Sequence, residues 1–237
     1  MSLDYRFTCR AAEGLAIVVA GVEVVCRPSG ALWIEAEGAL VVADLHLEKG
    51  SAYASRGQLL PPYDTDETLG RLEDEARALA PRLIVLLGDT LHDAGGEARM
   101  SADAAGRLAA LARRRTLVWI LGNHDRAGKG ALAGDTVGSL SVNGLRLVHE
   151  PADGQATAEV GGHLHPCAKV AGRGGAVRRR CFVTDGGRLV LPAFGAYAGG
   201  LNVRDAAFQR LLRHPPLAAV LGDARVHPVG WRRLRAD

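Results

Sequence analysis

Five short segments of the sequence combine histidine with aspartate, asparagine and glycine. In chain order they are Asp44-Leu45-His46, Gly88-Asp89, Gly122-Asn123-His124-Asp125, His149-Glu150 and Gly162-His163-Leu164-His165. Six of the eight histidines of the chain lie in or beside these segments. Imidazole, carboxylate and amide groups are ligands for hard and borderline divalent cations. The segments therefore predict a metal-dependent site.

The spacing of these residues indicates room for two cations. Asp44 and His46 are two residues apart after an apolar run, so in an extended backbone their side chains leave one face and can bind one cation. Asp89 adds a carboxylate whose two oxygens can bridge two metals, and Asn123 offers a carbonyl oxygen. Two coordination shells are completed by His149, His163 and His165. Two cations about 3.5–4 Å apart lower the pKa of a bridging water and hold the attacking and leaving oxygens of a phosphate ester.

His124 follows Asn123 directly and is not needed as a ligand. It is free to donate a hydrogen bond to a phosphoryl oxygen or to protonate a leaving group. Asp125 or His92 could orient it. His92 lies three residues after Asp89, where a phosphate contact, a supporting hydrogen bond and a plain surface position all stay open. We predict a catalytic group of His124 with His92 and Asp125.

Strands and helices must bring these segments together. Residues 40–43, 83–87, 117–121 and 145–148 are short apolar runs typical of strands, and each ends at a predicted ligand. In α/β sheets, ligands gather beyond the carboxyl ends of the strands. Asp64 to Glu67 has the spacing of a capping box before a helical pattern that ends at Pro81, and Ser101 precedes a second helix ending near residues 113–115.

The remaining segments favour a second sheet. Residues 14–37 predict a strand meander, residues 180–183, 188–191 and 218–221 further strands, and residues 204–213 a short helix. Residues 128–134 and 171–176 are expected to be loops. The predicted fold class is α/β (α+β), with two mixed sheets packed face to face and flanked by helices.

Composition is that of an ordinary globular protein. The 237 residues include 48% hydrophobic and 23% charged residues, which excludes a polar disordered chain. We expect one domain over residues 1–237. The net charge of +3 and pI near 8.8 permit a phosphate-rich partner without requiring one.

The chain gives no sign of membrane association or of a cysteine-based cofactor site. The apolar stretch at residues 15–22 is interrupted by Glu23 and is too short to span a bilayer, so a soluble, cytoplasmic protein is expected. Its cysteines form no C-x-x-C pair and are expected to be packed, reduced thiols: Cys9, Cys26, Cys167 and Cys181.

The motif order D-x-H, G-D, G-N-H-D, a single H and G-H-x-H resembles the calcineurin-like metallophosphoesterase superfamily. The resemblance implies a four-layer sandwich, a catalytic His124, and manganese as the metal, although the ligands themselves also suit iron or zinc. Many superfamily phosphatases have an aspartate in the position of His92, where a histidine is similar to certain repair nucleases. By this resemblance, one metal is held by Asp44, His46, Asp89 and His165, and the other by Asp89, Asn123, His149 and His163.

A closer resemblance is to the ligase-associated DNA damage response endonuclease (PdeM) family. It rests on Asp44-Leu-His-Leu-Glu-Lys-Gly50, Leu60-Pro-Pro-Tyr-Asp-Thr65, His149-Glu-Pro151, Arg179-Arg-Cys-Phe182 and Leu191-Pro-Ala-Phe-Gly-Ala-Tyr-Ala-Gly-Gly200, and it covers residues 40 to 205. This resemblance implies a nuclease of DNA repair that works with DNA ligase and helicase proteins. It does not imply an oligomeric state.

The sequence thus predicts a phosphodiesterase that uses metal-activated hydroxide, with DNA as one candidate substrate. A nucleotide or small-molecule phosphatase, and a non-catalytic metal-binding scaffold, are the alternatives. Two basic clusters could neutralise nucleic-acid phosphates or form solvated faces: Arg178-Arg179-Arg180 and Arg232-Arg233-Leu234-Arg235. Glu48, Lys49 and Arg56 are close enough in sequence to the first motif to reach a phosphate, and a solvated loop explains them equally well.

Overall fold

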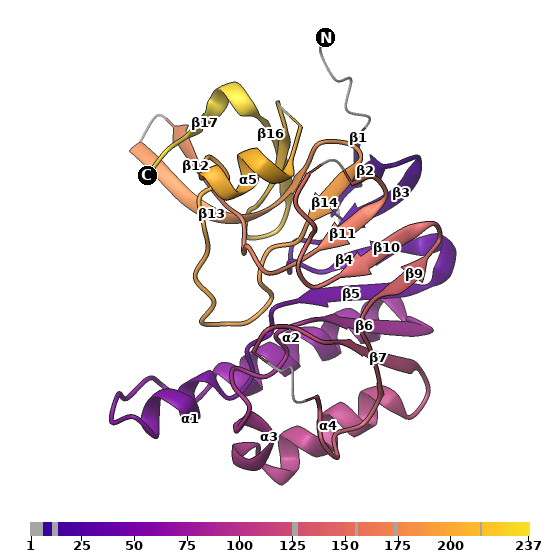
Figure 1. Cartoon of the computed structure of the whole chain (residues 1–237), viewed down its shortest axis with the longest axis vertical. Coiled ribbons are helices and arrows are strands. Elements are labelled where there is room, and N and C mark those ends of the chain that lie inside the picture. Colours follow the sequence, from indigo (N-terminus) through magenta and orange to yellow (C-terminus); the bar gives the residue numbers. More distant parts are fainter. Residues whose placement is uncertain (1–6, 11–13, 125–127, 155, 173–174, 214) are drawn as a thin grey trace.

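A computed structural model describes residues 7–10, 14–124, 128–154, 156–172, 175–213 and 215–237. Within these residues, two sheets are packed against each other (Figure 1). The first sheet has the spatial order β1-β2-β3-β4-β5-β6-β7-β8. Its strands are β1 (Phe7–Arg10), β2 (Gly14–Val19), β3 (Val22–Cys26), β4 (Leu32–Ile34), β5 (Ala39–Ala43), β6 (Leu83–Leu87), β7 (Thr116–Ile120) and β8 (Asp135–Val137).

The first sheet is mixed. Strands β1 to β5 form an antiparallel meander, which confirms the meander predicted for residues 14–37, and β5 to β8 run parallel. Strand β5 is buried on both faces: Val41 packs toward the second sheet, whereas Leu40 and Val42 pack toward the helices. Parallel strands covered on both sides need this continuous apolar character.

The second sheet is also mixed, with the order β16-β15-β13-β14-β11-β10-β9. Strands β10, β11 and β14 run parallel, and β12 pairs with β13 and β17. The strands are β9 (Leu140–Val142), β10 (Leu145–Val148), β11 (Glu159–Gly161), β12 (Cys167–Gly172), β13 (Gly175–Thr184), β14 (Arg188–Val190), β15 (Leu217–Leu221), β16 (Val226–Gly230) and β17 (Leu234–Arg235).

Helices cover the outer faces of both sheets. Helices α2 and α4 pack on the first sheet, and α5 packs on the second. The helices are α1 (Lys49–Ala54), α2 (Asp64–Leu79), α3 (Gly96–Arg99), α4 (Ala102–Ala112) and α5 (Ala206–Leu211), with 3-10 turns η1 (Glu35–Glu37) and η2 (Trp231–Arg233). The order helix, sheet, sheet, helix confirms the predicted four-layer sandwich.

The predicted capping box of α2 is wrong. Asp64 is the first helical residue, and its carboxylate accepts a hydrogen bond from the Gly50 amide (3.0 Å) instead of capping its own helix. The Asp64 carboxylate, which the sequence predicted to cap α2, therefore makes a tertiary contact with α1 instead. The second helix behaves as predicted, because the Ser101 hydroxyl accepts from the Ala104 amide at 3.1 Å.

The loop predicted for residues 171–176 is also wrong. Ala171 and Gly172 belong to β12 and pair with Ala176 and Gly175 of β13, and residues 173–174 lie outside the described residues. Because this segment is rich in alanine and glycine, it lacks the alternation of apolar and polar residues that predicts a strand. Residues 128–134 contain no strand or helix, as expected.

Cysteine burial and membrane topology can be checked for the described part of the chain. Cys26, Cys167 and Cys181 are free and buried, as predicted, and the side chain of Cys9 lies outside the described residues. No described helix combines the length and the apolar character that crossing a bilayer would need.

Candidate metal centre

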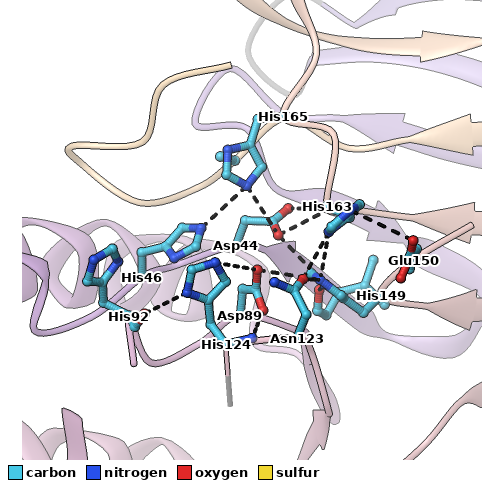
Figure 2. Close-up of polar contacts among 12 residues, drawn as sticks. Asp44, His46, Asp89, His92, Asn123, His124, His149, Glu150, His163 and His165 are labelled. Carbon is cyan, nitrogen blue, oxygen red and sulfur yellow. Dashed lines mark hydrogen bonds and ion pairs between the residues drawn. The ribbon is translucent and has the colours of Figure 1, made fainter. Parts of the chain in front are cut away.

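All five predicted ligand segments follow the carboxyl end of a parallel strand. Asp44 follows β5, Asp89 lies two residues beyond β6, and Asn123 lies three residues beyond β7. His149 follows β10 and His163 lies two residues beyond β11, so the second sheet supplies the other two segments. Figure 2 shows the side chains of all five segments converging on one place. Strand direction in both sheets thus creates a single site.

Pairing between two strand ends continues into the site. The Asp44 amide donates to the Gly88 carbonyl (3.2 Å), and the His46 amide donates to the Asp89 carbonyl (2.9 Å). The Leu47 amide then donates to the Thr90 carbonyl at 2.8 Å. This ladder of backbone hydrogen bonds fixes the first two segments relative to each other without any contribution from their side chains.

The backbone at the site is left-handed at five predicted ligands. These are Asp44 (φ 53°), His46 (φ 45°), Asp89 (φ 44°), His163 (φ 67°) and His165 (φ 46°). The extended conformation predicted for Asp44 and His46 is therefore wrong, although both side chains enter the same site. Left-handed backbone in residues other than glycine costs about 1–3 kcal/mol each and is concentrated at functional sites. The surrounding fold offsets this cost.

The first group of side chains joins Asp44, His46 and His165, whose ligand atoms lie within 4.8 Å of one another. The Nε2 atoms of His46 and His165 are 3.4 Å apart, and His165 Nε2 is 3.4 Å from Asp44 Oδ1. Burial, followed by the charge of His165, lowers the pKa of His46 to about 2. Burial opposes protonation of His165 as well, but its hydrogen bond to Asp44 and the charge of that carboxylate raise its pKa.

The second group joins Asp89, Asn123, His149 and His163. The Asn123 Oδ1 atom is 2.9 Å from His149 Nε2 and 3.0 Å from His163 Nδ1, and these two ring nitrogens are 3.2 Å apart. His149 Nε2 is also 3.4 Å from Asp89 Oδ2. The exposed edge of this group opens into a hollow of about 380 Å³ that Asn123, His149 and Glu150 help to line.

Asp89 lies between the two groups. Its Oδ2 atom faces His149 of the second group, and its charge contributes to raising the pKa of His165 in the first. Its Oδ1 atom accepts from the backbone amide of His124 at 2.9 Å, which holds the carboxylate in place. The carboxylate is only 2% exposed as a residue, so its charge is screened little by water. This position suits a bridging ligand.

The arrangement of nitrogen and oxygen atoms in the second group suits a bound cation better than a network of hydrogen bonds. His149 Nδ1 faces two acceptors, the Leu87 carbonyl at 3.4 Å and Asp44 Oδ1 at 3.7 Å, so it bears the hydrogen. The lone pair of Nε2 then points at Asn123 Oδ1, itself an acceptor. Facing lone pairs repel unless a cation lies among them, and histidine ligands are commonly oriented through their other nitrogen in this way.

Two glycines make room for this packing. A Cβ atom at Gly122 would lie 2.2 Å from Asp89 Oδ1, and one at Gly88 would lie 2.1 Å from His149 Nδ1. Both contacts are too short for any side chain. The glycines that precede Asn123 and Asp89 in the sequence are therefore required by close approach across the site.

The three residues predicted as catalytic have different outcomes. His124 is 40% exposed, and its Nε2 atom is 3.9 Å from Asp89 Oδ2. The backbone carbonyl oxygen of His92 lies 2.7 Å from His124 Nδ1. The ring of His92 stacks at 5.7 Å from that of His124, and burial together with the charge of Lys49 lowers its pKa. Asp125 lies outside the described residues.

The charged residues after the first motif are held within the protein. The buried Glu48 carboxylate accepts from Ser51 Oγ (2.7 Å) and Thr65 Oγ1 (3.0 Å). Lys49 Nζ donates to the Tyr197 carbonyl at 2.9 Å, and Arg56 lies 3.8 Å from Asp93. Glu48 is therefore a structural residue, whereas the side chains of Lys49 and Arg56 lie at the edge of the site.

Tyr53 was not anticipated from the sequence. Its ring lies 5.9 Å from the ring of His92, and Lys49 Nζ lies 5.9 Å from its centroid. The four-residue spacing of Lys49 and Tyr53 is the only local signal, and it has meaning only once α1 is known to be helical.

Two mixed sheets with a cation-binding cluster at their strand ends define a hydrolase of the metallophosphoesterase type. The family model for calcineurin-like phosphoesterases matches residues 39–223, and the chain therefore belongs to that family. Members of this family use divalent metals, and the clustered histidines and aspartates of this chain are suitable ligands.

Solved structures that resemble the chain include a nuclease and a phosphoesterase. A nuclease from Pseudomonas putida, called MPE, is 26% identical, has a TM-score of 0.68, and is matched over 95% of this chain and 100% of its own. The phosphoesterase Yfce from E. coli is 16% identical with a TM-score of 0.42, over 81% of this chain and 97% of its own, and is too distant to guide interpretation. No curated protein matches the chain.

Proposed function

We propose that this hydrolase is a phosphodiesterase that cuts nucleic acid with the help of two divalent cations. The observation that carries the proposal is the arrangement of seven side chains in two adjacent groups, with Asp89 in the second, its charge acting on His165 of the first, and His124 beside them. A single metal would leave one of these two groups of ligands without a cation. The chain's own residues favour this reading independently of any relative.

Asp44, His46 and His165 would hold one cation, Asn123, His149 and His163 the other, and Asp89 would contact both. When bound, such a pair supplies Lewis acidity toward the phosphoryl oxygens and an activated water nucleophile. The oxygen and nitrogen ligands suit manganese, iron and zinc. We propose manganese, which the sequence resemblance implies.

His124 is the residue of this chain that acts on the departing or phosphoryl oxygen. Because the His92 carbonyl can only accept, Nδ1 of His124 carries a hydrogen, and Nε2 remains to exchange a proton with the substrate. In its protonated form, Nε2 can donate to a phosphoryl oxygen or to the leaving oxygen of the cleaved bond. The exposure of the ring lets solvent restore that proton after each turnover.

Two observations support nucleic acid as the substrate. The Pseudomonas putida protein that matches this chain over nearly the whole length of both is a nuclease. Lys49 and Arg56 lie near His92 and add positive charge beside the site, which suits a phosphate-bearing substrate. A role in DNA repair, with DNA ligase and helicase proteins as partners, and a cytoplasmic location are further parts of the proposal that rest on the sequence alone.

The test is a panel of substrates supplied with manganese. Purified protein is assayed with a chromogenic phosphodiester, the matching monoester, single-stranded DNA and duplex DNA, and the Asp89→Asn variant serves as the control for contaminating activity. We expect cleavage of the diester and of DNA by the wild-type protein alone. Turnover of the monoester without any diester or DNA cleavage would favour the small-molecule phosphatase and overturn the proposal.

A further inference from the structure

Two arginines that are distant in the sequence meet on one short segment of backbone. Arg71 of α2 donates from Nη2 to the Phe194 carbonyl (2.7 Å), and Arg180 of β13 donates from Nη1 to the Ala193 carbonyl (2.8 Å). The guanidinium carbon of Arg71 also lies 5.1 Å from the Phe194 ring centroid. Consecutive carbonyl groups thus hold two cationic side chains close together.

Neither of these arginines forms an ion pair with a carboxylate among the described residues, although the charge of Glu67 acts on both and partly opposes the lowering of their pKa values by burial. Arg71 Nε is buried and has no hydrogen-bond partner there. Burial, followed by the charge of Arg180, lowers the pKa of Arg71, and burial lowers that of Arg180. Several other partly or fully buried arginines of the described chain pair with carboxylates, as in Arg27–Glu75, Arg99–Asp93, Arg107–Glu73 and Arg188–Glu159, whereas Arg204 is held by backbone carbonyls and the Trp231 ring.

The two arginines line an open cavity of about 490 Å³, which we call the arginine pocket. Arg178, on the same face of β13 as Arg180, adds a third cation at its edge and donates to the Gly200 carbonyl at 2.6 Å. Asp223 is the one carboxylate of the lining, and its Oδ1 atom lies 3.9 Å from Arg179 Nη2. Arg178 pairs with Asp237 (3.4 Å) and Arg179 with Asp223, so Arg71 and Arg180 are the arginines of this lining without an ion pair among the described residues.

The segment 193–200 separates the arginine pocket from the metal centre. On one side it accepts the hydrogen bonds of Arg71 and Arg180, and on the other the Gly195 amide donates to the Asp44 carbonyl at 3.1 Å. A Cβ atom at Gly195 would lie 2.2 Å from the Leu45 carbonyl oxygen, so the contact is direct. In Figure 1 this segment, between β14 and α5, descends from the second sheet toward α2.

We propose that the arginine pocket binds a phosphate group of the same nucleic-acid strand whose diester is cut at the metal centre. Guanidinium groups bind phosphate through paired, charge-assisted hydrogen bonds, and an anion held between the two guanidinium groups would offset the repulsion between their like charges. This inference rests on the proposed function for the identity of the strand. The bound phosphate would position the strand across segment 193–200, at a distance from the reacting atoms.

Binding of a labelled single-stranded DNA 12-mer, followed by fluorescence anisotropy in EDTA so that no cleavage occurs, tests the pocket. The variants are Arg71→Gln, Arg180→Gln and the double variant, because glutamine can still donate to the backbone carbonyls. Arg77→Gln, on the exposed face of the same helix, is the matched control. We expect each single variant to bind about tenfold more weakly, the loss of one charge-assisted hydrogen-bonded contact.

The salt dependence makes the prediction sharper. Loss of one phosphate contact lowers the slope of log affinity against log salt by about 0.7 for a single strand. Because both arginines hold the same phosphate, the double variant should lose the slope of one phosphate contact and no more, each single variant should lose at most that amount, and Arg77→Gln should match the wild type. A slope and affinity unchanged in Arg71→Gln and Arg180→Gln would overturn the proposal.

Further measurements separate the alternatives. A structural role for the arginines would lower kcat/KM for DNA and for a small diester equally, whereas the pocket predicts a larger loss for DNA. Competition with inorganic phosphate that disappears in the variants, without any change in DNA affinity, would assign the pocket to a free anion and overturn the strand assignment. Absence of diester cleavage would contradict the proposed function. Because anisotropy needs no turnover, the binding measurements would still test whether the pocket holds a phosphate group.

Discussion

The Nδ1 atom of His124 lies 2.7 Å from the backbone carbonyl oxygen of His92. A carbonyl accepts but cannot donate, so this contact fixes the hydrogen on Nδ1 and leaves Nε2 facing the site, 3.9 Å from Asp89 Oδ2. The orientation of the proposed proton donor is thus set by main chain, and a side-chain carboxylate is not required to set it.

The first prediction is that His124→Ala keeps its metals and loses activity. A positioned proton donor contributes about 10²–10⁴-fold to a rate, and kcat should fall within that range. Metal content by mass spectrometry and kcat on a chromogenic diester are measured together. Loss of both metals, with activity restored merely by excess metal, would show instead that His124 is a ligand.

The second prediction concerns His92→Ala. Because the backbone carbonyl of residue 92 survives the substitution, His124 should keep its orientation, and kcat/KM should fall by at most about tenfold, the value of one ordinary hydrogen bond. The same diester assay, run beside His124→Ala, gives the comparison. A loss as large as that of His124→Ala would place the His92 ring itself in the proton transfer.

The third prediction is that Asp89→Asn folds normally and loses most of its turnover. The amide oxygen can still accept from the His124 backbone, but the negative charge shared by the two groups is gone. Bound metal should drop below two per chain, and activity should fall by more than about a hundredfold. Near-normal turnover with two metals bound would remove Asp89 from the bridging position.

The fourth prediction tests the space at Gly122. In Gly122→Ala, the new Cβ would lie 2.2 Å from Asp89 Oδ1, so the carboxylate must shift and activity should drop by about a hundredfold. Gly106→Ala is the matched control, because nothing lies within 4 Å of a Cβ there and α4 should gain about 0.5–1 kcal/mol. Melting curves and diester assays of both variants provide the comparison, and full activity in Gly122→Ala would contradict it.

The fifth prediction concerns metal removal. Asp44 is 0% exposed and Asp89 2% exposed, so the metal-free protein keeps two buried carboxylates near each other. Manganese at about a hundred times its Kd should raise Tm by about 5–10 °C over protein in EDTA. The double variant Asp44→Asn, Asp89→Asn should show no response to manganese. A wild-type Tm that is indifferent to EDTA would argue against structural metal binding.

The sequence by itself determined the strands that carry the site and most of its chemistry. Apolar runs such as residues 83–87 form buried parallel strands because continuous hydrophobicity suits a sheet covered on both faces, and each run ends at a ligand. The three-residue strand β11 escaped detection because Glu159–Gly161 has too few residues to show a period. Its position became visible only through pairing with β10 and β14.

The tertiary structure alone decided how the side chains meet. Left-handed backbone at Asp44 and His46 is unfavourable locally and is stabilised by the ladder to residues 88–90, which no local pattern encodes. The same holds for Asp64, whose carboxylate binds Gly50 in preference to its own helix. Arg71 gave no signal in the sequence, and it meets Arg180 only because the carbonyls of Phe194 and Ala193 accept hydrogen bonds from the two side chains. Local propensity is set by neighbours in the chain, whereas contacts across more than a hundred residues depend on how the two sheets close on each other.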